Sequence, residues 1–192
     1  MKSLKSVLQD NDVVLVVGTG VSAALTSNSP LASWPGLLRA GADYLDRMDS
    51  SESGQYASSV ASLLNIGTTA MTISAATVVE TALQSGGMAA FGRWLEESVG
   101  DLTVSDPAVA IALGKLKRPI LTTNYDTLLE DALDRSSVTW RDPSGVQRAL
   151  RGETSDIVHL HGVWNDAESV ILADGDYSRL EASEGAQALQ KE

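Results

Sequence analysis

The stretch RPILTTNYDTLLEDALDR, Arg118–Arg135, joins an apolar strand pattern, a polar turn and a helical pattern. The apolar run ends at Leu121, a polar string follows from Thr122 to Asp126, and helical spacing resumes at Leu128. Open α/β sheets place their ligands at the carboxyl ends of parallel strands. The stretch therefore predicts a strand–turn–helix unit with a binding site at its turn.

Further strand patterns lie on both sides of this unit. The β-branched run DVVLVV, Asp12–Val17, ends at Gly18 and predicts a central parallel strand that is buried on both faces. DIVHLHG predicts a third strand and ESVILA a fourth. Because helical patterns alternate with these strands, we expect an α/β, Rossmann-like three-layer fold with a mainly parallel sheet.

The helical patterns fill the intervals between strands. SWPGLLRAGADYLDRM places Pro35 near a first helical turn and spaces its leucines for a helix. Residues 50–87, rich in Ser, Gly and Thr, predict a helical insertion within a single domain of residues 1–192. Other helices are expected at residues 3–9, 88–99, 107–117 and 126–135.

Composition excludes several classes of function. With 14 Lys and Arg against 25 Asp and Glu, the chain has a net charge of −11 and no basic run, so we expect no direct nucleic-acid binding. It has no Cys, which removes disulfides, thiol nucleophiles and thiolate zinc sites. The apolar runs are too short for a membrane span and no signal-peptide core is present, so a cytoplasmic location is expected.

The loop after the first strand carries the first chemical motif. Gly18-Thr19-Gly20-Val21-Ser22-Ala23 matches the dinucleotide fingerprint, in which glycines let the backbone approach a pyrophosphate at a helix N-terminus. A tight turn without a ligand is the alternative. A dehydrogenase also needs an acidic residue on a second strand, but Asp43 and Asp46 fall in a helical segment, which disfavours that class.

Polar residues at the next two strand ends supply the other motifs. The Asn124 amide offers a donor and an acceptor for water or a ribose hydroxyl, whereas Asp126 either contacts a ligand or caps the following helix. The two histidines of the chain, His159 and His161, alternate on a predicted strand and should share a face. Core packing or a metal pair are the alternatives, and a metal pair lacks a third ligand. His161 is the better cleft candidate.

The order GTGVS, TTNYD, HLHG, each at a strand end, resembles the sirtuin superfamily. The resemblance is closer to the sirtuin-like domains of bacterial anti-phage defence proteins, which share the Trp of SWPGLL, the TTNYD form and a helix start like DYSRL at Asp176–Leu180. It extends from about Asp12 to Leu180. Deacylating sirtuins also carry a four-Cys zinc module, which this chain cannot build.

The resemblance implies NAD as substrate, no metal, and NAD hydrolysis in preference to protein deacylation. It implies that the glycine loop holds the diphosphate, that Asn124 positions water or ribose, that Asp126 contacts ribose or the nicotinamide carboxamide, and that His161 is the base. The implied catalytic residues are Asn124, His161 and Asp126. The implied NAD-binding residues are Gly18, Thr19, Gly20, Val21, Ser22, Trp34, Thr123, Asn124 and Asp126.

Two other functions stay open at this point: an NAD-dependent protein deacylase, and a non-catalytic NAD or ADP-ribose sensor or oligomerisation module. The resemblance also implies a homo-oligomer, or a further domain or partner protein that controls activity. Related domains usually continue to a Gly-x-Ser motif on a later strand. We therefore expect the domain to be incomplete at its C-terminus. We also expect this chain alone to bind NAD weakly, to turn it over slowly or not at all, and to self-associate.

Overall fold

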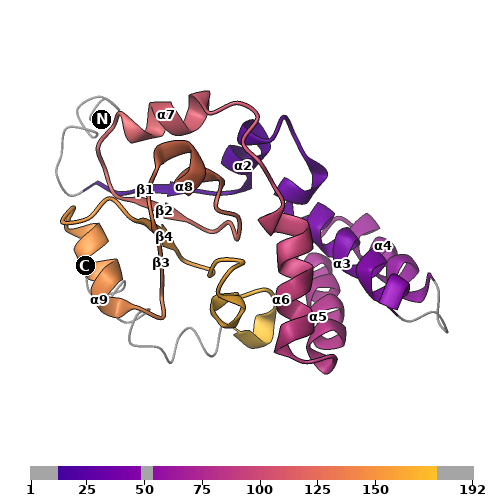
Figure 1. Cartoon of the computed structure of the whole chain (residues 1–192). Helices are drawn as coiled ribbons and strands as arrows, with labels where there is room; N and C mark the ends of the chain where they lie inside the picture. Colours follow the sequence, from indigo (N-terminus) through magenta and orange to yellow (C-terminus); the bar gives the residue numbers. More distant parts are fainter. Residues whose placement is uncertain (1–12, 49–53, 177–192) are drawn as a thin grey trace.

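The computed structural model describes residues 13–48 and 54–176. Within them, four parallel strands form one sheet in the order β1-β2-β4-β3 (Figure 1). The strands are β1 (Leu15–Val17), β2 (Ile120–Thr122), β3 (Ser137–Thr139) and β4 (Ile157–His159). The predicted helix at residues 3–9, and the DYSRL segment apart from Asp176, lie outside the described residues.

The register aligns the carboxyl ends of all four strands. Val17 pairs with Thr122, Thr122 with His159, and His159 with Thr139, so these residues form one row across the sheet. The chain leaves β1, β2 and β4 directly after this row. The loops that carry the three sequence motifs therefore emerge side by side at one edge of the sheet.

Helices cover the two faces of the sheet and confirm the three-layer prediction (Figure 1). Alternate residues of a strand point to opposite faces. Ile120 packs with residues of α2 (Thr19–Leu25), α7 (Ala108–Gly114) and α8 (Leu128–Leu133). On the other face, the strand core packs against α9 (Pro143–Leu150); this cluster contains Leu121, Val138, Val146, Ala149 and Val158.

The prediction that Asp12–Val17 forms a central strand buried on both faces is wrong. β1 lies at one edge of the sheet, and the Val16 side chain is 62% exposed. Leu15 and Val17 pack against the core on one face only. A β-branched run indicates a strand, but its place in the sheet depends on partners that are distant in sequence.

The predicted fourth strand, ESVILA, is also wrong. Ala167–Ser169 forms the 3₁₀ helix η3, and residues 170–173 have no strand assignment. Their side chains are apolar because they are buried, most of them against the helical core. The fourth strand of the sheet is β3, whose three residues are too short to show a clear alternation in the sequence.

A helical layer lies beside the sheet (Figure 1). It consists of α3 (Trp34–Met48), α4 (Gln55–Asn65), α5 (Thr69–Ser85), α6 (Met88–Leu95) and the π-helical turn η2 (Glu96–Gly100), preceded by the 3₁₀ helix η1 (Pro30–Ala32). The helices predicted at Trp34–Met48 and 88–99 are confirmed. α4 and α5 occupy most of residues 50–87; their status as an insertion within a single domain stays a prediction.

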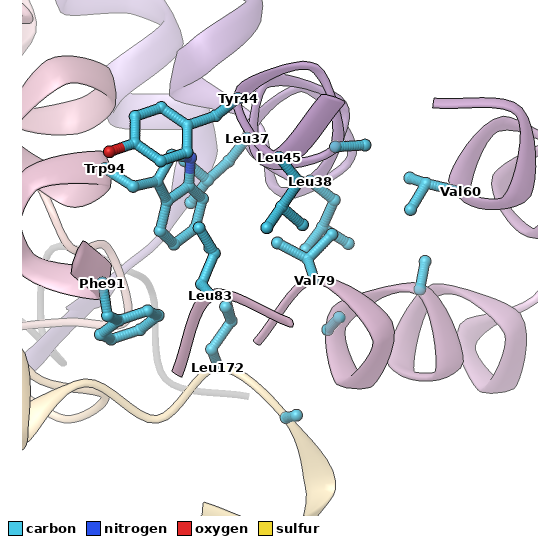
Figure 2. Packing of buried hydrophobic residues seen from close by; sticks show 14 of the residues in the cluster. Leu37, Leu38, Tyr44, Leu45, Val60, Val79, Leu83, Phe91, Trp94 and Leu172 are labelled. Carbon is cyan, nitrogen blue, oxygen red and sulfur yellow. The ribbon is translucent and has the colours of Figure 1, made fainter. Parts of the chain in front are cut away.

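The helical layer encloses a large apolar core (Figure 2). Trp94 and Phe91 are each 1% exposed, and their ring centroids lie 5.6 Å apart. Gly41 allows α3 to approach this core closely, since a Cβ there would lie 2.5 Å from the Val79 side chain. The layer therefore presents a rigid wall to the adjoining edge of the sheet.

Candidate functional site

A cavity of about 210 Å³ lies between the carboxyl edge of the sheet and the helical layer. Six of the residues predicted from the sequence line it: Thr19, Trp34, Thr123, Asn124, Asp126 and His161. Its apolar wall comes from Leu31, Ala32, Leu37, Val99, Ile171 and Leu172. Ser33 and Tyr125 complete the lining. The cavity therefore combines a few polar groups with an apolar wall, as small-molecule sites do.

The glycine loop borders this cavity without lining it fully. Gly18, Gly20, Val21 and Ser22 are not among the lining residues. Gly18 directly precedes α2, and a Cβ added at Gly20 would meet no atom within 4 Å. The backbone at Gly20 is consequently open to a ligand, while Ser22 lies inside the protein, 1% exposed.

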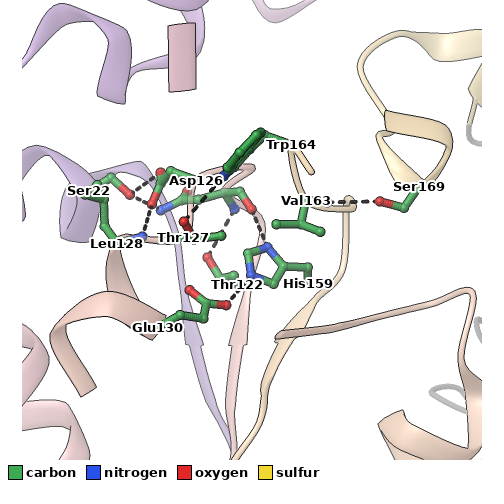
Figure 3. A network of polar contacts seen from close by, with 11 residues as sticks. Ser22, Thr122, Asp126, Thr127, Leu128, Glu130, His159, Val163, Trp164 and Ser169 are labelled. Atoms are coloured by element: carbon green, nitrogen blue, oxygen red, sulfur yellow. Dashed lines mark hydrogen bonds and ion pairs between the residues drawn. The ribbon is translucent and has the colours of Figure 1, made fainter. Parts of the chain in front are cut away.

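Ser22 connects the glycine loop to the TTNYD turn (Figure 3). Its hydroxyl donates to Asp126 Oδ2 at 2.7 Å and accepts from Asn124 Nδ2 at 2.6 Å. Asp126 Oδ1 also accepts the Leu128 N–H at 3.3 Å, at the start of α8. The N-cap position of α8 is Thr127, and Asp126 just before it both accepts the first N–H of the helix and lines the cavity, so the two alternatives seen in the sequence are compatible.

Two buried polar atoms of the cavity residues lack a hydrogen-bond partner among the described residues. They are Oδ1 of Asn124 and Nε1 of Trp34. Buried polar atoms in native proteins are nearly always hydrogen-bonded to protein or ordered water. An acceptor and a donor are therefore left without partners inside one cavity wall.

Burial changes the proton affinity of two cavity residues in opposite directions. Desolvation raises the pKa of Asp126, even though hydrogen bonds from Ser22 and Leu128 and the nearby His159 act to lower it. Desolvation lowers the pKa of His161 below its ordinary value of 6.5. His161 is therefore neutral at pH 7 and able to accept a proton.

The turn after β4 holds His161 at the cavity. The His161 carbonyl accepts the Ile171 N–H at 2.9 Å. Gly162 has a φ of +83°, and a Cβ there would lie 2.2 Å from the Ser169 carbonyl oxygen. Only glycine suits both conditions, so the Gly in HLHG is required to form the turn that places His161.

The two histidines do not share a strand face as predicted. β4 ends at His159, and the chain turns before His161. His159 is fully buried and does not line the cavity. Its Nδ1 lies 2.8 Å from the Asn124 carbonyl oxygen and its Nε2 lies 2.6 Å from Glu130 Oε1. The alternative of a packed, hydrogen-bonded histidine therefore holds for His159.

Several residues that build the site were not evident from the sequence. Glu130 is 7% exposed on α8, next to Leu129. A carboxylate within an apolar helical stripe was the signal that could have revealed it. Tyr125 Oη donates to the Ile171 carbonyl at 2.8 Å and ties the turn to the apolar wall. The apolar wall could not be predicted from the sequence, because Ile171 lies in the segment that was expected to form a strand.

Neither a metal cluster nor a membrane helix is found in the part of the chain that the structure describes. Residues 13–48 and 54–176 hold no group of three or more His, Cys, Asp or Glu side chains that could bind a metal ion. Over the same residues, no helix has both the length and the apolar character needed to cross a membrane.

Residues 118–191 match the protein family described as SIR2-like domain. This part of the chain is similar to a sirtuin-like domain. The matched residues include the TTNYD turn and the His161-Gly162 pair, which the structure places at one cavity. No solved structure gives a significant match. The family supports an NAD-related, sirtuin-type function for this domain.

The glycine loop lies outside the matched residues, yet it contacts the TTNYD turn within them. Ser22 and Asp126 are 104 residues apart in the chain and are joined by a buried hydrogen bond. Thr19 lines the cavity together with Thr123 and Asn124. The two parts of the chain therefore form one site.

Proposed function

We propose that the chain is an NAD glycohydrolase, which cleaves NAD to nicotinamide and ADP-ribose. The observation that carries the proposal is one cavity lined both by Asn124, whose buried amide oxygen has no partner among the described residues, and by His161, a histidine held neutral by burial. The family match to a SIR2-like domain supports NAD as the substrate. The resemblance to anti-phage defence domains supports a role in depleting NAD during infection.

The proposed reaction breaks the bond between ribose C1′ and the nicotinamide nitrogen. Nicotinamide leaves as a neutral ring, so the site must mainly stabilise an oxocarbenium-like ribose and direct a water to C1′. Asn124 Oδ1 is suited to accept a hydrogen bond from that water or from a ribose hydroxyl. Neutral His161 would take the proton released as water adds. The apolar wall suits the nicotinamide ring.

The remaining contacts concern the rest of the substrate. Asp126 is proposed to contact ribose or the carboxamide through the part of its side chain that lines the cavity. The open backbone at Gly20, at the start of α2, is proposed to receive the diphosphate. Gly18, Thr19 and Val21 complete that proposed loop.

The test is to incubate the full chain with NAD and to measure free nicotinamide, with and without an acylated lysine peptide. A glycohydrolase releases nicotinamide and ADP-ribose without peptide. Release only with peptide, together with O-acyl-ADP-ribose, would show a deacylase. NAD binding by calorimetry without release would show a non-catalytic module. Light scattering in the same buffer tests the proposed homo-oligomer.

A further inference from the structure

The buried pair of Glu130 and His159 is the polar feature of the site that the proposed chemistry does not use. His159 ends β4, Glu130 lies in the first turn of α8, and Asn124 lies in the turn after β2. Figure 3 shows the carboxylate of Glu130 directed at the His159 ring, which lies below the Asp126 turn. The pair thus joins three separate segments behind the cavity.

The two contacts of the His159 ring require a proton on each of its nitrogens, that is, the charged imidazolium form. A carbonyl oxygen can only accept, so the 2.8 Å contact with the Asn124 carbonyl requires a proton on Nδ1. Nε2 faces Glu130 Oε1 at 2.6 Å. Burial alone lowers the pKa of His159, but the bond to Glu130 outweighs it and the pKa is raised. Glu130 therefore keeps His159 a donor toward Asn124.

Asn124 is held at three of its four hydrogen-bonding groups. Its N–H donates to Thr122 Oγ1 at 3.1 Å, its carbonyl accepts from His159, and its Nδ2 donates to Ser22 Oγ at 2.6 Å. Among the described residues, only Oδ1 has no partner. The three bonds fix both the backbone and the amide plane. The free acceptor is consequently left in a single orientation.

Filling the space behind the turn does not by itself require charged groups. Replacing a buried ion pair with apolar residues is often neutral or stabilising. Leu128 and Leu129, which directly precede Glu130, already pack in an apolar cluster there. Only a donor at the position of Nδ1, however, can hold the Asn124 carbonyl. Stability alone therefore does not account for the pair.

We propose that His159, oriented by Glu130, is a positioning residue that sets the orientation of the Asn124 amide toward the substrate. This inference rests on the proposed NAD cleavage. His159 does not line the cavity, so it acts through Asn124 without touching the substrate.

Two polar substitutions separate positioning from packing. In His159→Asn the side-chain amide nitrogen takes the place of Nδ1 and can still donate to the Asn124 carbonyl, but it loses Glu130. In His159→Gln the amide takes the place of Nε2, so it can reach Glu130 but not Asn124. Both variants place a neutral polar side chain in the same buried space, and each loses one contact.

The experiment measures kcat and KM for nicotinamide release by each full-length variant, together with its melting temperature. We expect kcat to fall about 100-fold in His159→Gln, which is the loss typical of a misplaced reacting group. His159→Asn should retain most of the wild-type kcat. The melting temperature should fall at least as far in His159→Asn, which leaves the buried Glu130 carboxylate unpaired, so a kcat loss confined to His159→Gln cannot come from lower stability. Equal kcat values in the two folded variants, or a larger loss in His159→Asn, would overturn the proposal.

Two further arms extend the test: the first uses substitutions at Glu130 in place of His159, and the second uses a measurement that does not require turnover. Glu130→Gln keeps an oxygen toward Nε2, and Glu130→Leu does not, so kcat should fall further in Glu130→Leu; equal values contradict the proposal. If the wild-type chain releases no nicotinamide, the proposed function fails. The ¹H–¹⁵N signals of the Asn124 side-chain amide then decide the positioning: they should move in His159→Gln and stay nearly unchanged in His159→Asn. The opposite result refutes it.

Discussion

The helical layer and the carboxyl edge of the sheet bury their side chains in opposite ways. The layer of α3 to α6 buries apolar groups such as Trp94 and Phe91, whose contacts depend on volume and little on direction. The sheet edge buries Ser22, Asn124 and His159 in hydrogen bonds that specify direction. The difference teaches that stability and orientation come from separate regions, so substitutions should separate them too.

The largest effect on stability is expected at the centre of the helical layer. Trp94→Ala removes a side chain that is 1% exposed, and should lower the free energy of unfolding by about 3–5 kcal/mol. Urea denaturation measures it. Met48→Ala, at a side chain that is 67% exposed, is the control and should change it by less than about 0.5 kcal/mol. A loss of kcat in the folded Trp94→Ala protein would break the comparison.

Asn124→Ala should show the reverse pattern. Nicotinamide release should fall by about 100-fold or more, as when a preorganised polar group is removed from a reaction site. Stability should fall by only about 1–3 kcal/mol, because Ser22 loses one buried partner. A stopped assay of released nicotinamide measures the activity, and urea denaturation measures the stability. Asn65→Ala, at an exposed position of α4, is the matched control. Full activity in folded Asn124→Ala would remove this residue from the mechanism.

Ser22→Ala sharpens the comparison because it should affect both properties moderately. It leaves Asn124 Nδ2 and Asp126 Oδ2 without their shared partner and should cost about 1–3 kcal/mol of stability. Because the Asn124 amide is then free to turn, kcat should also fall, by less than in Asn124→Ala. Ser62→Ala, on the exposed side of α4, controls for loss of a hydroxyl. Unchanged kcat would show that the Ser22 bond is not needed for orientation.

The smallest effect concerns pH. The pKa of His161 lies below 6.5, so the folded protein favours the neutral ring. Activity should therefore persist as pH falls through 6.5 and decline only below it. The stability contributed by this group is present above pH 6.5 and is lost as pH falls toward its folded pKa, because the unfolded state binds the proton first.

A pH profile of kcat, repeated with Asp126→Asn, checks the assignment. The decline of kcat at low pH should remain in this variant, because its residual activity still depends on neutral His161. If the decline of kcat at low pH disappears in Asp126→Asn, the titrating group is the Asp126 carboxylate, whose pKa is raised by burial.

Local patterns predicted much of this fold. The segment from Ile120 to Leu133 reads as strand, turn and helix because its signals lie within a few residues of each other, and β2 and α8 appear there. The edge position of β1 could not be read in this way, since it depends on pairing between Val17 and Thr122, far apart in the chain. The strand predicted around Ile171 is wrong for a related reason. Its apolar side chain is buried in the core, but this segment pairs with no strand.

The candidate site was predicted by residue type and less well by role. Asn124, Asp126 and His161 do share one cavity, because the strands that carry them end in register. The separate position of His159 and its bond to Glu130 depend on where β4 ends and how α8 packs. The sequence shows that Glu130 lies in an apolar helical stripe beside Leu129, which is unusual for a carboxylate. It does not show that His159 is its partner.

The three bonds that hold Asn124 also bear on the thermodynamics of substrate binding. A free amide side chain would have to give up its rotational entropy when substrate arrives, at a cost of about 0.5–1.5 kcal/mol for an immobilised side chain. Here the N–H, carbonyl and Nδ2 groups are already bonded before any ligand is present. That entropy is lost on folding, so binding at Oδ1 requires no further ordering of this residue.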